Sequence, residues 1–114
     1  MNRRLVTAGS INAALAVGAG AFAAHGLRDR LTTHSLEIFE TAARYHMYHA
    51  LAMILAGIIA ARTAGWIFQL GIVLFAGSLY MLALTDVKVL GAVTPLGGVA
   101  FLVGWLWLAF SARR

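Results

Sequence analysis

Four long stretches of this chain contain no Lys, Arg, Asp or Glu, and together they fill most of its 114 residues. They cover residues 5–27, 45–61, 63–85 and 89–112. A helix needs about 20 apolar residues to cross roughly 30 Å of hydrocarbon. Three stretches reach that length, and the shorter second one needs its polar and aromatic start as a collar at the membrane surface. The sequence therefore predicts an all-α membrane protein, a bundle of four transmembrane helices.

The composition agrees with this fold class. Hydrophobic residues make up 61% of the chain and charged residues 11%, whereas soluble domains carry about 25% charged residues. Four spans and their connections use the whole length, so we expect a single domain over residues 1–114. The predicted helices cover about residues 5–25, 35–61, 63–85 and 95–112. Any function is then expected inside the bundle or at its two ends.

The net charge of +5 does not indicate a nucleic-acid partner. The basic residues are spread over the predicted helix ends instead of forming one stripe, which favours lipid headgroups as their counter-ions. The chain contains no cysteine. This excludes disulfides, thiolate metal sites and iron–sulfur clusters.

The N-terminus also has features of a secretory signal, with Arg3 and Arg4 before an apolar run and a small-x-small pattern at residues 21–23. The apolar run is about 20 residues long, longer than the 7–15 residues of a signal peptide. An uncleaved first helix is therefore the favoured interpretation.

Each crossing of the membrane switches sides, so four spans sort the charges into two faces. The face with both termini carries five arginines and no acid, and the other face carries four basic residues, every acid, every histidine and every tyrosine. The positive-inside rule then predicts that both termini lie in the cytoplasm. The residues of the terminal face are Arg3, Arg4, Arg62, Arg113, Arg114, Trp66, Trp105 and Trp107.

Two connections carry signals for helix starts. Residues 35–44 have apolar side chains at helical spacing and predict an amphipathic extension before the second apolar stretch, with Ser35 as its N-cap. Thr94 followed by Pro95 predicts an N-cap and a first-turn proline for the last helix. Residues 86–93 then form a loop or a short re-entrant turn.

Small residues recur at intervals of three or four in the first and last helices. Such stripes let helix backbones approach closely in lipid. We interpret them as contact faces, which serve packing within one bundle or association of several copies equally well. They include Gly9, Ala13, Ala14, Ala16, Gly18, Gly20, Gly97, Ala100 and Gly104.

Histidines form the densest polar feature of the chain. His46 and His49 lie three residues apart and share one helix face, and the topology brings His25 to the same side of the membrane. Imidazole binds metals and haem iron and relays protons. The alternative is an interfacial belt of histidine and tyrosine, which is the favoured interpretation because two histidines do not fix a metal. His34, in the polar connection, is expected to be solvated.

The middles of the predicted helices contain no ionisable group, which argues against a proton-driven pump. Four polar side chains lie there instead, and each is expected to hydrogen-bond between helices. They are Asn12, Gln69, Ser78 and Tyr80.

These observations converge on one predicted site. We expect His25 and His49 to lie within a few ångströms of each other at the outer membrane level, because one ends a helix and the other follows the start of its antiparallel neighbour. The predicted pocket is polar and shallow, and the start of the last helix would favour an anionic headgroup or a carbonyl there. Its candidate residues are His25, His46, Tyr48, His49, Tyr80, Asp86 and Thr94.

Several motifs resemble a known family. They are GAFAAHGL at 20–27, FETA–Y-MYHAL at 39–51, the GI-LF-GSLY-LALT pattern at 71–85 and TPLGG at 94–98. In combination they resemble the YgdD/YwdK-like small membrane proteins, domain-of-unknown-function family 423, which is related to eukaryotic transmembrane protein 256. The resemblance implies a four-helix inner-membrane protein and brings no reaction, substrate or cofactor. Polar or special backbone residues within the motifs are His25, Tyr48, His49, Ser78, Tyr80, Thr94 and Pro95.

The sequence favours a non-enzymatic membrane module, either an accessory subunit of a larger membrane complex or a lipid- or quinone-binding protein. The alternative is a small transporter or channel, formed by one chain or by an oligomer, and an enzyme or haem protein is favoured least. Membrane lipids are the expected partners. No catalytic residue or metal site is predicted, and cofactor and oligomeric state stay open.

Overall fold

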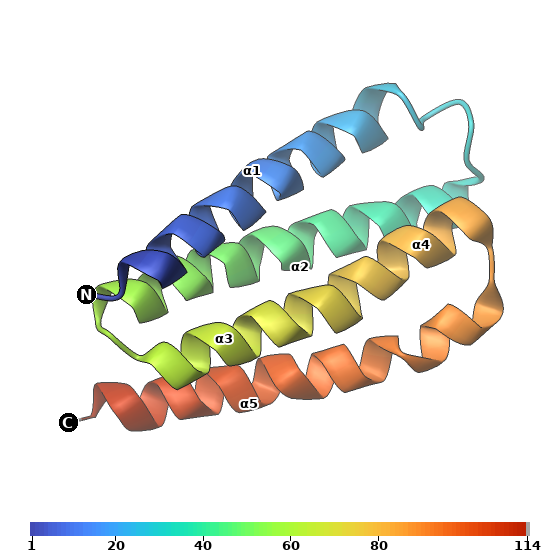
Figure 1. Ribbon diagram of the computed structural model, residues 1–114. Helices are drawn as coiled ribbons and strands as arrows, with labels where there is room; N and C mark the ends of the chain where they lie inside the picture. Colours follow the sequence, from blue (N-terminus) through green and yellow to red (C-terminus); the bar gives the residue numbers. More distant parts are fainter. Residues whose placement is uncertain (114) are drawn as a thin grey trace.

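The computed structural model describes residues 1–113, so Arg114, one of the arginines assigned to the terminal face, lies outside them. Four long helical segments run antiparallel within these residues, which contain no strand (Figure 1). The all-α prediction is confirmed. The segments are α1 (Arg3–His25), α2 (Thr33–Ile58), a continuous third segment made of α3 (Arg62–Gly71), the π-helical η1 (Ile72–Ala76) and α4 (Gly77–Thr85), and α5 (Thr94–Ala112).

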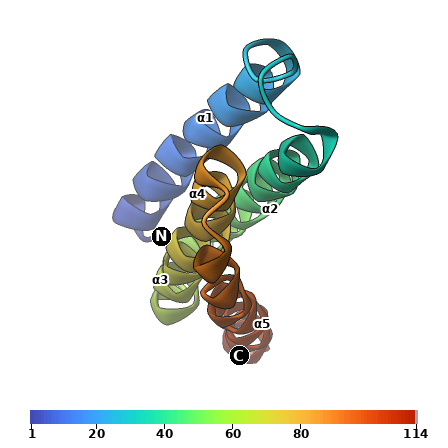
Figure 2. The same cartoon turned by 90° about the vertical axis from the view of Figure 1, so that its right-hand side faces the viewer.

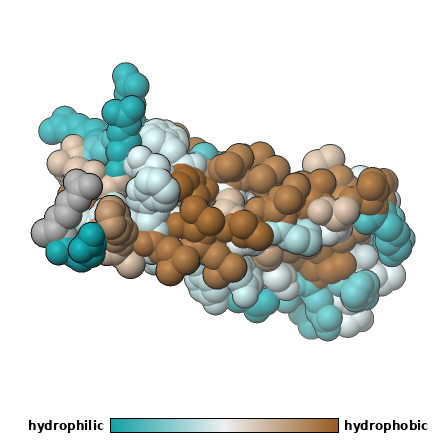
Figure 3. Space-filling model, turned by 90° about the horizontal axis from the view of Figure 1, so that it is seen from below, coloured by the Kyte–Doolittle hydropathy of each residue, from teal (hydrophilic) through white to brown (hydrophobic). Residues whose placement is uncertain are grey.

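Three helical segments are long and apolar enough to cross a membrane: Arg3–His25, Arg62–Thr85 and Lys88–Ala112. The face seen in Figure 3 carries hydrophobic residues over the middle of the molecule and hydrophilic residues at both ends, as a membrane protein requires. α2 is not among the three, since its first half is polar and charged. By length and composition, the described residues therefore hold three candidate spans, and the predicted fourth span is not confirmed.

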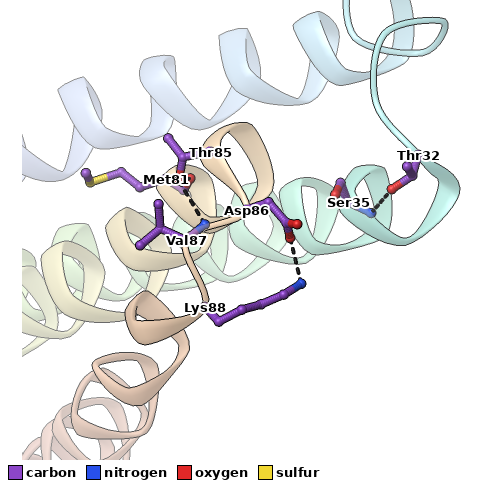
Figure 4. Close-up of polar contacts among 7 residues, drawn as sticks. All are labelled: Thr32, Ser35, Met81, Thr85, Asp86, Val87 and Lys88. Carbon is purple, nitrogen blue, oxygen red and sulfur yellow. Dashed lines mark hydrogen bonds and ion pairs between the residues drawn. The ribbon is translucent and has the colours of Figure 1, made fainter.

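α2 begins earlier than the sequence predicts. The Thr32 hydroxyl accepts a hydrogen bond of 3.1 Å from the Ser35 backbone N–H, so the N-cap is Thr32, and the prediction of Ser35 is wrong (Figure 4). The extension itself is present and amphipathic. Phe39 is buried while Glu40 is exposed, and the helix continues without a break to Ile58.

α5 begins at Thr94 without the predicted cap. The short 3-10 helix η2 (Lys88–Ala92) leads into Val93, whose backbone is already helical, so Thr94 lies inside the first turn. Its hydroxyl contacts Ser78 Oγ on α4 at 2.6 Å. The Thr94 hydroxyl therefore ties two helices together, while Pro95 occupies the first turn as predicted.

Several glycines lie where two helices approach most closely, but some glycines of the predicted stripes do not. A methyl group on Gly9 would lie 2.8 Å from the Ala50 carbonyl oxygen, and one on Gly104 would lie 2.7 Å from the Phe68 ring. In contrast, methyl groups on Gly18 or Gly20 would meet no atom within 4 Å. The predicted contact role is therefore wrong for Gly18 and Gly20, because the second half of α1 diverges from the third helical segment.

α1 packs mainly on α2 and touches the third segment little. In Figure 1 α2 lies between α1 and the third segment, whereas in the end view of Figure 2 α4 lies between α1 and α2, so the three segments are arranged as a triangle. The register of α1 on α2 is set by Gly9 beside Ala50 and by the Phe22 ring, 6.4 Å from the Phe39 ring. This arrangement leaves room between α4 and the C-terminal half of α1.

Candidate functional site

Two histidines lie near the middle of the bundle. His46 is 6% exposed and His49 is 4% exposed, and both lie close to the midpoint of α2. The prediction that the helix middles hold no ionisable group is therefore wrong. Its error came from placing residues 45–49 at the membrane surface as an interfacial collar, whereas they lie at the middle of α2.

His46 belongs to a set of polar side chains from three helical segments, called here the polar network: Asn12, His46, Gln69 and Tyr80. His46 Nδ1 lies 3.0 Å from the Tyr80 hydroxyl, and Nε2 lies 2.9 Å from Asn12 Oδ1. Asn12 Nδ2 donates to Gln69 Oε1 at 2.8 Å and to the Ala8 carbonyl at 2.9 Å. The expected hydrogen bonds between helices are thus confirmed for Asn12, Gln69 and Tyr80, and Ser78 makes its own with Thr94.

The polar network has one consistent direction of hydrogen bonding. A carbonyl only accepts, so the bond to Ala8 fixes the Asn12 nitrogen and leaves Asn12 Oδ1 as the acceptor for His46. His46 then carries its proton on Nε2, and Nδ1 accepts the proton of the Tyr80 hydroxyl. The imidazole is neutral with both nitrogens engaged. It therefore has no lone pair left for a metal.

His49 is held separately, on the side of α2 that faces α5. The Trp105 indole N–H only donates, so His49 Nε2 accepts this 3.0 Å bond, and His49 Nδ1 donates to the Tyr45 carbonyl at 2.7 Å. Its ring stacks on Phe101 with centroids 3.5 Å apart. His49 is thus a neutral, fully bonded side chain that locks α5 onto α2.

A groove of about 740 Å³ opens on the surface of the bundle over the polar network. Its walls are α1 from Asn12 to Phe22 and the third segment from Gln69 to Leu84, and its floor includes Phe39 and His46 of α2. Apart from the polar network, the lining side chains are apolar. This volume and this mixture are typical of small-molecule sites; "the groove" refers to this feature below.

The π-helical segment η1 forms part of the groove. Ile72, Val73 and Ala76 line it, directly after Gln69 in the chain. Short π-helical segments inside α-helices are rare and occur frequently at functional sites. The irregular backbone therefore coincides with the polar floor.

The predicted meeting of His25 and His49 does not occur. His25 is exposed and lies one turn beyond Phe22, which is beside Phe39. His49 lies ten residues after Phe39, about 15 Å further along α2 at the rise of a helix. The shared site of His25 and His49 is therefore wrong.

The remaining candidates lie in three other places. Tyr48 is half-exposed and lines, with His49, a second groove of about 610 Å³ between α2 and α5. Asp86 is exposed in the connection after α4 and pairs with Lys88 at 2.7 Å (Figure 4). Thr94 bonds to Ser78. Of the seven predicted residues, only His46 and Tyr80 share a site through direct bonds.

Sequence reasoning missed the walls of the groove. Gly18 and Gly77 line it and have open space over them, but a glycine stripe gives the same signal whether a helix or a small molecule covers it. It also missed the link from His49 to Trp105, because the topology placed these residues on opposite faces. Nothing in the sequence indicates that His49 and Trp105, each near the middle of its helix, form a hydrogen bond with each other.

The chain has recognisable relatives. The sequence profile of a family described as "Protein of unknown function (DUF423)" matches residues 19–98. The UPF0382 membrane protein YwdK of Bacillus subtilis is 48% identical over 114 residues, covering 93% of each chain. A UPF0382 membrane protein of Staphylococcus epidermidis is 49% identical over 112 residues, covering 93% of this chain and 92% of the relative. No solved structure matches.

Proposed function

We propose that this chain, which belongs to the DUF423 family of membrane proteins of unknown function, is a non-enzymatic module of the bacterial inner membrane that binds a lipid or quinone in the groove. The observation that carries the proposal is the combination of apolar walls with a polar floor near the middle of the bundle. Polar groups at this depth are costly and mark functional sites by default. Since both His46 nitrogens are engaged, the site is suited to binding more than to catalysis.

The proposal includes α2 as a fourth span. Its polar side chains His46 and His49 are buried in the bundle. They lower the mean hydropathy of α2 but do not contact the lipid. Its exposed side chains from Tyr45 onward are aromatic or aliphatic: Tyr45, Tyr48, Leu51, Leu55 and Ile58. The aliphatic side chains and the apolar faces of the tyrosine rings suit the hydrocarbon.

Filling the groove should remove the bound molecule without unfolding the protein. We expect Gly18→Leu, which projects into the groove, to eliminate most of the ligand that copurifies in mild detergent. The measurement is native mass spectrometry of the intact protein combined with its absorption spectrum. Gly20→Leu is the matched control, since Gly20 has the same open surroundings but does not line the groove. Equal ligand content in both variants would contradict binding in the groove.

The orientation is also testable. A reporter fused after Arg114 should lie in the cytoplasm, and one inserted near Thr33 should lie outside, because the terminal face carries five of the nine basic residues and no acid. Accessibility labelling in whole cells makes the measurement. Labelling of both sites on the same side would show that α2 does not span the membrane. Reversed labelling would show that the protein has the opposite orientation.

A small transporter or channel is the second candidate. It is favoured by the hydrogen-bonded chain from Tyr80 through His46 and Asn12 to Gln69, which crosses the bundle near mid-depth. Histidines in such positions serve proton relays in transporters. Proton flux into proteoliposomes that depends on His46 would favour this candidate over the binding module.

A further inference from the structure

The polar network leaves one polar group without a partner. Gln69 Oε1 accepts from Asn12 Nδ2, so the side-chain nitrogen, Nε2, carries the two N–H groups. Within residues 1–113 this nitrogen donates no hydrogen bond, and it is not enclosed in the core. Gln69 is half-buried and lines the groove. The N–H groups of Gln69 Nε2 that lack an acceptor therefore lie in the wall of the groove.

The two free N–H groups of Gln69 matter because of the depth at which Gln69 lies. Gln69 lies seven residues into the third segment, about 10 Å from its start, and is bonded to Asn12 in the middle of α1. Hydrocarbon offers no water to such a group, and an unsatisfied N–H there costs several kcal/mol. An acceptor carried by a lipid-soluble molecule would satisfy it.

The lining of the groove restricts the chemistry of that molecule. It contains no Lys, Arg, Asp or Glu within the described part of the chain, so nothing balances a charged headgroup. The protons of Tyr80, His46 and Asn12 are already donated inside the polar network. The groove thus needs a neutral acceptor, since unpaired N–H donors are less tolerated than spare oxygen lone pairs.

The groove continues away from Gln69 along a path that two glycines leave open. Gly18 on α1 and Gly77 on α4 both line the groove, and a methyl group on either would meet no atom within 4 Å. Beyond them the walls become apolar toward Phe22 and Leu84 at the outer end. A polar head group at Gln69, with a hydrocarbon tail that passes over these glycines toward that end, fits this gradient.

We propose that the groove binds a neutral quinone, with a quinone carbonyl oxygen accepting a hydrogen bond from Gln69 Nε2 and the tail lying toward Phe22 and Leu84. This assignment rests on the proposed function and names its ligand class. The polar network holds Gln69 in place, because Asn12 bonds its oxygen and thereby aims its nitrogen at the groove. No electron transfer is part of the proposal.

The test uses the full-length protein in nanodiscs with decylbenzoquinone as the probe. Gln69→Met keeps the side-chain length and a weak sulfur acceptor for Asn12, as Met53 already provides at 3.7 Å, but it removes both donors. The affinity for decylbenzoquinone should weaken about fivefold, the size expected from one net hydrogen bond. The affinity for decylbenzene, which lacks a carbonyl, should not change between wild type and variant.

A second measurement needs no variant. The carbonyl stretching band of isotope-labelled decylbenzoquinone should shift to lower frequency when it binds the wild-type protein. An unshifted band, or equal wild-type affinity for decylbenzene and the quinone, would overturn the carbonyl assignment while leaving an apolar ligand in the groove. Preferential binding of dioctanoylglycerol would overturn the quinone in favour of a glyceride. Binding of none of these probes would count against the proposed function itself.

Discussion

Gly97→Ala should lower the free energy of unfolding by about 3 kcal/mol, the upper part of the range for overpacked contacts. A methyl group on Gly97 would lie 2.7 Å from Phe75 Cα and overlap the Phe75 backbone. Because the obstacle is backbone in η1, α5 has to move away from the third segment. The loss should exceed the gain of up to about 1 kcal/mol that alanine brings to a helix interior.

The neighbouring residue provides the control. A methyl group on Gly98 would meet only the Phe75 ring, at 3.9 Å, so Gly98→Ala should leave the stability unchanged or raise it. Unfolding of both variants by SDS in mixed micelles, followed by circular dichroism, makes the comparison. Equal stabilities would show that α5 does not contact η1 as closely as described.

His46→Leu should destabilise the protein by about 2 kcal/mol. The substitution leaves the Tyr80 hydroxyl and Asn12 Oδ1 without their partner in a buried site, and each orphaned group costs about 1–3 kcal/mol in general. Hydrogen bonds between membrane helices average only about 0.6 kcal/mol, which lowers the expected sum. The same unfolding titration gives the measurement.

His34→Leu serves as the control for His46, since His34 is exposed near the start of α2. Surface substitutions of this kind change the stability by no more than about 0.5 kcal/mol. A His46 variant as stable as the His34 variant would mean that the polar network contributes nothing to folding. In that case the neutral, fixed imidazole described above would lose its support.

The helical fold could be predicted because an uncharged stretch of about 20 residues has the length of a helix that crosses the bilayer. α1, the third segment and α5 give this signal without ambiguity. α2 gives a weaker one, because its interior histidines lower its apolar content and look like an interfacial collar. In the structure those histidines face the interior of the bundle. Sequence alone does not reveal which face of a helix points inward in a bundle with few charges.

The site could be predicted only in part for the same reason. His46 and Tyr80 were identified from residue type, and Asn12 and Gln69 as polar exceptions in apolar helices. Their meeting depends on the register of α1 on α2, which is set by Gly9 beside Ala50. The error lay in the depth assigned to residues 45–49, which the sequence pattern places at the membrane surface and the structure places at the middle of α2. That error moved His49 toward His25 and away from Trp105.

The most direct test of the central proposal, a ligand in the groove, is photocrosslinking in native membranes. A diazirine analogue of leucine replaces Leu15, which lines the groove, or Leu70, which is similarly exposed but does not. Mass spectrometry then identifies what becomes attached to each position. The account predicts one discrete neutral, lipid-soluble species at residue 15 and bulk phospholipid at residue 70. The same bulk phospholipid at both positions would contradict it.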